Sequence, residues 1–382
     1  MISRVQAALE AIDPELGAFI TIDADGALAR ARHTPSGRAE GLIVAVKDLI
    51  DTASLRTTYG STRYADHIPR RTASIVTDLE RAGAVVIGKT NLNEFAYGVS
   101  GYNPHYGTMR LPQDRSRTPG GSSGGAAIAV ATGAADVGIG SDTSGSIRIP
   151  AACCAIVGFC CAAGAVRMDG IRPLAPDYDR AGYLTRDIPT LQRVLDILWL
   201  PSTRGLRVAS ASELPLPALP EEHWTLFRRQ AHGIHRETAA REPWTYGDDL
   251  HVKLGQPVGD PVRARGIMRA WRAEVMFALR GVDLHVGPVI DGQAPLVSDV
   301  LADYRNGTLH ASEPLLAHTP TANALGWPAL AVPAPDGPRQ ILGRPGAEPA
   351  ILALGAELSR AAISPHDSLV TATRPALRKR SN

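Results

Sequence analysis

Three segments of the chain carry residue types that could act together in nucleophilic chemistry. The first ends an apolar run with Lys47 in GLIVAVKDLID, the second sets Ser122 and Ser123 between glycine pairs, and the third closes a turn with Ser146. A serine hydroxyl attacks a carbonyl carbon well only when a base removes its proton. A lysine can be that base once burial favours its neutral form. The segments therefore offer a candidate base and candidate hydroxyl groups.

A second lysine competes with Lys47 for the role of base. Forty residues are Lys or Arg, and the lysines among them are Lys47, Lys89, Lys253 and Lys379. A chain so rich in arginine needs a reason to keep a lysine in an apolar segment, and the ability to lose a proton is such a reason. The alternative is a strand-end lysine that reaches solvent or pairs with Asp48. The local sequence does not separate Lys47 from Lys89.

The GGSSGG segment, residues 120–125, allows three interpretations. Its backbone N–H groups could cradle a phosphate before a helix, but the lysine of a P-loop is missing and no strand leads directly into the glycines. Ser122 or Ser123 could instead cap the helix that follows. In the third interpretation, one hydroxyl relays protons. A nucleophile elbow is a weak interpretation because the preceding LPQDRSRTP is not typical of a strand.

The DTSGS turn, residues 142–146, could stabilise a negatively charged oxygen. Thr143, Ser144 and Gly145 would present successive backbone N–H groups with little obstruction from side chains. Such donors can hold the oxyanion that forms when a serine such as Ser146 attacks a carbonyl. The alternative is an ordinary loop rich in glycine and serine.

Strands that alternate with helices must position these segments. We expect buried strands at 42–46, 84–87, 137–139, 206–209, 284–286 and 329–332. We expect helices at 1–12, 74–82, 125–135, 188–200 and within 345–361. This alternation predicts an α/β fold with a mixed, mostly parallel central sheet covered by helices. No stretch is typical of a flexible interdomain linker, so we expect a single large domain.

Composition excludes several classes of protein. Forty basic residues face 38 acidic ones, so no basic field predicts a nucleic-acid partner. No apolar run approaches the roughly 18 residues that span a bilayer, and the first residues are not typical of a signal peptide. The spacing of the four cysteines fits neither a zinc site nor a secreted disulfide framework. These features predict a cytoplasmic protein with no membrane partner and no metal; the cysteines are Cys153, Cys154, Cys160 and Cys161.

The three segments, in this order, resemble the amidase signature family of Ser–cis-Ser–Lys amidohydrolases. The family's Gly/Ser-rich signature appears as PGGSSGGAAIAVATGAADVGIGSDTSGSIRIPAA, and its lysine block as GLIVAVKDLIDT. Near the C-terminus, NALGWPALAVPAPDG is similar to the family's closing strands. The resemblance covers residues 38–360 and is weakest in the middle. It implies an amidase signature domain at 1–365, with a motif core at 38–200, a shortened variable region at about 200–280 and a flexible tail at 366–382.

The resemblance also implies roles for individual residues. Ser146 matches the nucleophile, Ser122 the cis-serine that follows a cis peptide, and Lys47, not Lys89, the base. The backbone of residues 143–146 matches the oxyanion hole. The implied reaction is hydrolysis of a small carboxylic amide to a carboxylate and ammonia or an amine through an acyl-enzyme. It needs no metal or organic cofactor, and its partners are the amide substrate and a possible second copy in a homodimer.

Departures from the family pattern keep other functions open. Ser144 stands where the family usually has a second glycine, and residues 158–166 read GFCCAAGAV in place of a GLKPT-like segment. A modified pocket could accept a carbamoyl or ureido amide, or a biosynthetic intermediate. A subunit of a tRNA-dependent glutamine amidotransferase is a further alternative, which the near-neutral charge and short middle region disfavour. A catalytically degenerate binding protein is the remaining one.

Overall fold

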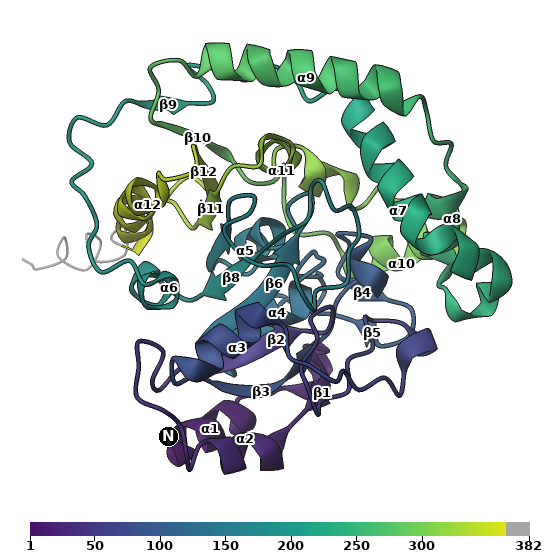
Figure 1. The fold of residues 1–382 in the computed structure, drawn as a ribbon, viewed down its shortest axis with the longest axis vertical. Helices are drawn as coiled ribbons and strands as arrows, with labels where there is room; N and C mark the ends of the chain where they lie inside the picture. The colour runs from purple at the N-terminus through teal and green to yellow at the C-terminus, as the bar shows by residue number, and fades with distance from the viewer. Residues whose placement is uncertain (364–382) are drawn as a thin grey trace, which may run out of the picture.

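A ten-stranded mixed sheet forms the centre of the molecule (Figure 1). The computed structural model describes residues 1–363, so the tail expected at 366–382 lies outside the described residues. The strands of the sheet are β1 Phe19–Ile22, β2 Ile43–Lys47, β3 Val85–Thr90, β6 Val137–Asp142, β7 Val157–Cys160, β8 Arg180–Thr185, β9 Val208–Ser210, β10 Leu284–Pro288, β11 Ala329–Val332 and β12 Arg339–Gly343. Their order is β1-β3-β2-β6-β8-β7-β11-β12-β10-β9. A separate ribbon pairs β4, Tyr102–Asn103, with β5, Gly107–Thr108.

Helices cover the sheet and extend beyond it. They are α1 Ile2–Glu10, α2 Ala24–Arg30, α3 Ser74–Arg81, α4 Gly124–Thr132, α5 Arg148–Cys153, α6 Ile188–Leu195, α7 Glu222–Arg241, α8 Asp248–Gly255, α9 Pro261–Ala278, α10 Val297–Asn306, α11 Pro320–Leu325 and α12 Glu348–Ile363. The helix expected at 188–200 is shorter than expected. It ends because Asp196 adopts a left-handed conformation with φ 58°.

The expected α/β fold with a covered mixed sheet is confirmed, but parallel pairing is less extensive than expected. Parallel neighbours are β3–β2, β2–β6 and β10–β9, and the other neighbouring pairs are antiparallel. The short connection from β11 to β12 accounts for one antiparallel pair, because a hairpin can join only antiparallel strands. A continuous apolar run predicts a buried strand without giving its direction.

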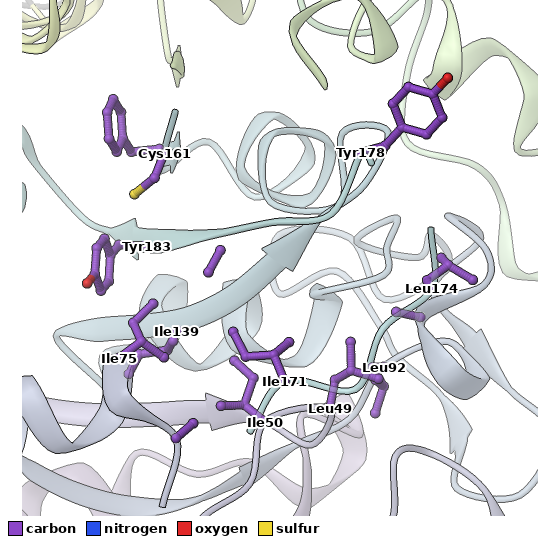
Figure 2. Packing of buried hydrophobic residues seen from close by; sticks show 14 of the residues in the cluster. Leu49, Ile50, Ile75, Leu92, Ile139, Cys161, Ile171, Leu174, Tyr178 and Tyr183 are labelled. Atoms are coloured by element: carbon purple, nitrogen blue, oxygen red, sulfur yellow. The ribbon is translucent and has the colours of Figure 1, made fainter. Parts of the chain in front are cut away.

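The largest cluster of buried side chains lies between the sheet and the helices that cover it. Figure 2 shows part of this cluster, with Ile75 of α3 near Ile139 of β6 and Tyr183 of β8. All three are less than one-tenth exposed. Burial of such a side chain stabilises the fold by about 1.5–3 kcal/mol. This packing fixes the strands whose ends carry the candidate site.

The register of the parallel strands brings Lys47 and the start of the DTSGS turn to one edge of the sheet. Val46 of β2 lies opposite Ile139 of β6. Both strands then end at this edge, β2 at Lys47 and β6 at Asp142. The carboxyl ends of parallel strands are a common place for ligand sites in α/β proteins.

Candidate active site

Lys47 lies fully buried at the end of β2 and contacts the GGSSGG segment. Its Nζ donates a hydrogen bond to Ser122 Oγ at 2.7 Å and another to Ser141 Oγ at 2.9 Å. The carbonyl of Ser141 lies 3.4 Å from Nζ. All five residues of β2 are buried, and the side chain of Lys47 itself is not exposed to solvent. The alternative of a lysine that reaches solvent is therefore wrong.

Burial changes the protonation of this lysine. Desolvation lowers the pKa of Lys47 from 10.5 to about 7, and the negative charges of Asp142 and Asp179 offset part of that fall. Near neutral pH, a substantial fraction of the amine is therefore neutral. A neutral amine in hydrogen-bond contact with a serine hydroxyl can accept a proton from it.

Lys89 is equally buried but has different partners. Its Nζ donates to the carbonyl of Ile50 and, at 2.7 Å, to Thr57 Oγ1, and lies 3.5 Å from Asp48 Oδ1. Burial lowers the pKa of Lys89 to about 8, against the opposing effect of Asp48. Asp48 therefore pairs with Lys89 rather than with Lys47. Geometry separates the two lysines that local sequence could not.

The GGSSGG segment contacts both other candidate segments: Ser122 lies against Lys47, and Ser123 lies against Ser146. The peptide bond between Gly121 and Ser122 is cis, as the resemblance implied. The amide of Ser123 donates to the carbonyl of Ser146 at 3.0 Å, so the two candidate segments are joined through their backbones. Ser123 Oγ donates to the carbonyl of Ser141 at 3.2 Å. Ser123 is the N-cap residue of α4, as the capping interpretation expected, but its side chain makes no capping hydrogen bond.

A buried carboxylate shapes the turn that carries Ser146. Asp142 accepts hydrogen bonds from the amides of Gly145 at 2.7 Å and Ile147 at 3.1 Å. It also forms a buried ion pair with Arg148, whose Nη2 lies 2.9 Å from Oδ1. Burial alone would raise the pKa of Asp142, but the charge of Arg148 and these hydrogen bonds outweigh it and lower that pKa. The Asp142–Arg148 ion pair therefore holds the turn, and Gly145 provides the positive φ that the turn requires.

Gly145 is required by both conformation and space. Its φ is 124°, and a Cβ there would lie 2.1 Å from Thr319 Oγ1. Its N–H, expected to belong to the oxyanion hole, instead donates to Asp142, because the carboxylate folds back under the turn. Among residues 1–363, the amides of Thr143, Ser144 and Ser146 have no hydrogen-bond acceptor. These three amides are free to bind a ligand, whereas the amide of Gly145 is bonded to Asp142.

Residues far along the chain hold this turn from the opposite side. Thr319 Oγ1 donates to the carbonyl of Ser144 at 2.6 Å. Asn323 Nδ2 donates to the carbonyl of Asp142 at 2.7 Å and to its Oδ1 at 3.0 Å, and Asn323 Oδ1 accepts from Arg148 Nη2 at 2.6 Å. Sequence reasoning missed Thr319 and Asn323. The one signal was the resemblance of NALGWPALAVPAPDG, which begins with Asn323, to the family.

Asp179 is a second missed carboxylate at the turn. It accepts from Thr143 Oγ1 at 2.8 Å and from the amides of Leu174 and Ala175 at 2.9 and 3.1 Å. Burial raises the pKa of Asp179, and these hydrogen bonds oppose the rise. Asp179 thus ties the turn to the loop that contains Leu174, a residue of the cavity wall.

Ser146 opens into a cavity of about 420 Å³, whereas Lys47 and Ser122 do not line it. Thr143 and Ser144 also line the cavity, and the loop at 96–100 forms one wall. Apolar side chains dominate the other walls: Leu174, Trp224, Phe227, Leu309 and Leu316. A ligand in this cavity would therefore meet Ser146 first, with Ser122 and Lys47 behind it.

The region expected to be shortened supplies much of this cavity. Trp224, Phe227 and Arg228 come from α7, and Lys253 comes from α8. Arg228 pairs with Glu221 at 2.9 Å. Lys253 donates to the carbonyl of Tyr97 and, at 2.8 Å, to Asp249. Arg228 and Lys253, the two basic residues that line the cavity, are therefore each paired with a carboxylate.

Metal-ligand chemistry finds no support in the described part of the chain. No group of three or more His, Cys, Asp or Glu side chains within residues 1–363 could hold a metal ion. The four cysteines are unpaired, and burial raises their pKa values, to about 12 for Cys153 and Cys161. Over the same residues, no helix has the length and apolar character to cross a membrane.

Comparison with known proteins places this site in a family. The sequence model of the family described as Amidase matches residues 1–217, more than half of the chain. The chain belongs to the amidase family. The resemblance found in its motifs is thus confirmed, and it extends to a family of enzymes that act on carbon–nitrogen amide bonds.

Named relatives of the family match part of the chain. A glutamyl-tRNA(Gln) amidotransferase subunit from Koribacter versatilis is 39% identical over 237 residues, which is 60% of this chain and 49% of the relative. The protein of the same name from Anaeromyxobacter sp. (strain K) is 42% identical over 197 residues, 50% of this chain and 40% of the relative. The chain spans about half the length of the curated relatives that it matches.

Solved structures share the amidase fold over nearly the whole chain. A crystal structure of an amidase has a TM-score of 0.81 at 28% identity and covers 94% of this chain and 95% of its own. The structure of a vestigial protein complex related to an s-triazine catabolic enzyme also has a TM-score of 0.81, at 26% identity, and covers 94% of both chains. Allophanate hydrolase of Kluyveromyces lactis, at 21% identity and a TM-score of 0.80, is similar in fold.

Proposed function

We propose that this protein hydrolyses a small carboxylic amide to a carboxylate and ammonia or an amine, with Ser146 as the nucleophile. One observation carries the proposal: a buried lysine with a lowered pKa contacts Ser122 at 2.7 Å, in a segment bonded to the backbone of Ser146. A base, a relay hydroxyl and a nucleophile at the cavity wall are the parts that acyl transfer requires.

The proposed reaction begins with proton transfer towards the lysine. Ser146 Oγ passes its proton to Ser122, and Ser122 passes its own to neutral Lys47, while the new Oγ–C bond forms. The carbonyl oxygen becomes an oxyanion, which the free amides of Thr143, Ser144 and Ser146 stabilise. Collapse of this intermediate breaks the C–N bond. The leaving nitrogen takes a proton from Ser122, and Ser122 regains one from protonated Lys47, which restores the neutral base. Water then hydrolyses the acyl-enzyme through the same relay.

The cavity supports an amide with an apolar acyl group. Its volume of about 420 Å³ fits a small molecule. Trp224 and Phe227 lie 5.6 Å apart, centroid to centroid, and Tyr97 lies 5.5 Å from Phe227. A cluster of aromatic rings favours an aryl or arylalkyl group through offset or edge-to-face contacts. Arylacetamides are therefore the first substrates to test.

A second candidate substrate is a ureido amide. Ser144 lines the cavity, yet its Oγ is buried and has no hydrogen-bond partner among residues 1–363. A buried hydroxyl without a partner costs about 1–3 kcal/mol, which a polar group of the substrate could relieve. The second nitrogen of a ureido group could supply that contact.

The test is turnover of a panel of aryl amides and ureido compounds, with ammonia release as the readout. We expect wild-type activity on one class and its loss in Ser146→Ala. Full activity in Ser146→Ala would contradict the proposal. Comparison of Ser144→Gly on the two classes separates the substrates, because only the ureido class should lose affinity.

A further inference from the structure

The long helix α9 has an outer face that no other part of the described chain covers. Figure 1 shows α9 along one edge of the molecule, beyond α7 and far from the sheet strands at β1 and β3. Its inner face is buried through Ala264, Met268, Trp271 and Val275. Trp271 Nε1 also donates to the carbonyl of Pro217 at 3.1 Å. The helix therefore packs against the rest of the protein through its inner face alone among the described residues.

The outer face carries an apolar ridge where a solvent-exposed helix normally has polar residues. The ridge has spacings of three and four residues, and its members are Val262, Gly266, Ala270, Ala273 and Phe277. Val262 is 76% exposed and Phe277 is 67% exposed. A Cβ added at Gly266 would meet nothing within 4 Å. The middle of the ridge is thus small and open, and its two ends are bulky.

Arginines without acidic partners flank this ridge. Arg265, Arg269 and Arg272 follow at i, i+4 and i+7, so they lie on one side of the helix. Arg265 and Arg269 make no ion pair or side-chain hydrogen bond within residues 1–363, and Arg272 donates only to the carbonyl of Ala324. Residues 261–280 hold five arginines and one acidic residue, in a chain whose net charge is +2. Five arginines less one glutamate give this segment a local net charge of +4.

We propose that the outer face of α9 binds an acidic helix of a partner protein. Small residues in the middle of the ridge let a second helix approach closely, and Val262 and Phe277 would contact it at the ends. Arg265 and Arg269 would pair with its carboxylates, whereas Arg272 is bonded to α11. Arg280 lies 4.4 Å from the Phe277 ring centroid and holds that exposed ring in place.

The charges argue against a second copy of this chain as the occupant. Two copies that met through this ridge in an antiparallel pair would bring two rows of arginines side by side, and like charges repel. A lipid surface is also disfavoured, because interfacial helices insert bulky apolar side chains. Here the centre of the ridge, from Gly266 to Ala273, is small.

The position of α9 gives the partner a physical connection to the cavity. α9 packs along α7, which supplies Trp224 and Phe227 to the cavity wall. Arg272 reaches the carbonyl of Ala324 in α11 at 2.8 Å, and α11 also contains Asn323, which donates to the carbonyl of Asp142 in the DTSGS turn. The partner would therefore bind directly behind the elements that shape the site.

The test is binding of a synthetic helical peptide with a leucine/alanine ridge and a row of glutamates, followed by fluorescence anisotropy. We expect binding to the wild-type chain that weakens about tenfold or more in Arg265→Glu/Arg269→Glu. A matched peptide with lysines should bind this reversed variant instead. Ala273→Trp should weaken binding because it blocks close approach. The control Arg32→Glu/Arg204→Glu reverses exposed arginines elsewhere and should bind like wild type.

Several results would overturn the proposal. Equal peptide binding by the α9 variant and the control variant would show unspecific attraction, and unchanged binding by Ala273→Trp would show adsorption without helix packing. Failure of the wild-type chain to bind the glutamate peptide would remove the proposed partner. Binding to phosphatidylserine vesicles that depends on Arg265 and Arg269, without peptide binding, would make the face a lipid surface. Circular dichroism on each variant verifies that the helix content is retained.

Discussion

Two buried lysines in this arginine-rich protein differ in what surrounds them rather than in how deeply they lie. Lys47 contacts hydroxyl groups, whereas Lys89 lies 3.5 Å from the carboxylate of Asp48. A lysine next to hydroxyls can give and take a proton, while one next to a carboxylate is held in a charged pair. From sequence, the shortage of lysines marked both positions but could not rank them. The choice needed either the family motif or the partner atoms, which lie 75 residues away in the chain.

The replacement of Lys47 by arginine separates charge from proton transfer. We expect Lys47→Arg to lower kcat by about 10²–10⁴-fold, as much as Lys47→Ala, because arginine keeps its charge and cannot act as a base. Amide turnover measures the loss, and thermal unfolding verifies that the variant folds. An active Lys47→Arg enzyme would contradict the relay role.

The replacement of Lys89 should act on stability instead. Lys89→Met leaves Asp48 as an uncompensated buried carboxylate, so we expect a loss of about 3–5 kcal/mol in the free energy of unfolding. The double variant Lys89→Met/Asp48→Asn should recover much of that loss because it removes the orphaned charge. Urea unfolding measures both. No loss in Lys89→Met, or no recovery in the double variant, would show that the pair does not contribute as proposed.

At the scale of elements, the turn at 142–148 is held from both sides. Its own Asp142 and Arg148 bind it from within the signature segment, and Thr319 and Asn323 bind it from just before and within α11. The strands that end at this edge were predictable from their apolar runs. The contribution of α11 was not, because a contact between residues 181 positions apart leaves no local pattern.

The loss of the Asn323 side chain should impair the turn. Asn323→Ala removes the donor to the carbonyl of Asp142 and leaves buried groups unsatisfied, so we expect about 1–3 kcal/mol lower stability. We also expect kcat to fall with KM little changed, because the free amides of the turn act on the transition state. Asn306, exposed at the end of α10, provides the matched control Asn306→Ala. A kcat that matches the control would contradict the role of Asn323.

At the scale of the whole molecule, the two parts of the site differ in how far sequence could predict them. The segments at 42–47 and 120–148 carried motifs and strong apolar patterns, so their strands and candidate residues were identified. The helices at 222–278 were not. Polar and charged residues dominate α7, and the stability of such a helix comes from tertiary packing. The cavity wall formed by Trp224 and Phe227 therefore appeared only in the structure.

The environment of Lys47 predicts how activity depends on pH. Burial lowers the pKa of Lys47 to about 7, and only the neutral amine can accept the proton of Ser122. The neutral fraction rises with pH, so kcat/KM should increase through about pH 7 and then level off. Initial rates from pH 5 to 9 measure the profile. A rate that falls as the pH rises through 7 would show that the charged lysine is the active form.

The most direct test of the proposed mechanism is covalent labelling of Ser146 by a fluorophosphonate probe, read by peptide mass spectrometry. A nucleophile at the cavity wall with a relay base behind it should form a single adduct on Ser146. Labelling should be absent in Ser146→Ala and strongly slowed in Lys47→Arg. If the folded wild-type protein forms no adduct on Ser146, or if Lys47→Arg is labelled at the wild-type rate, the proposed Ser146–Ser122–Lys47 relay is contradicted.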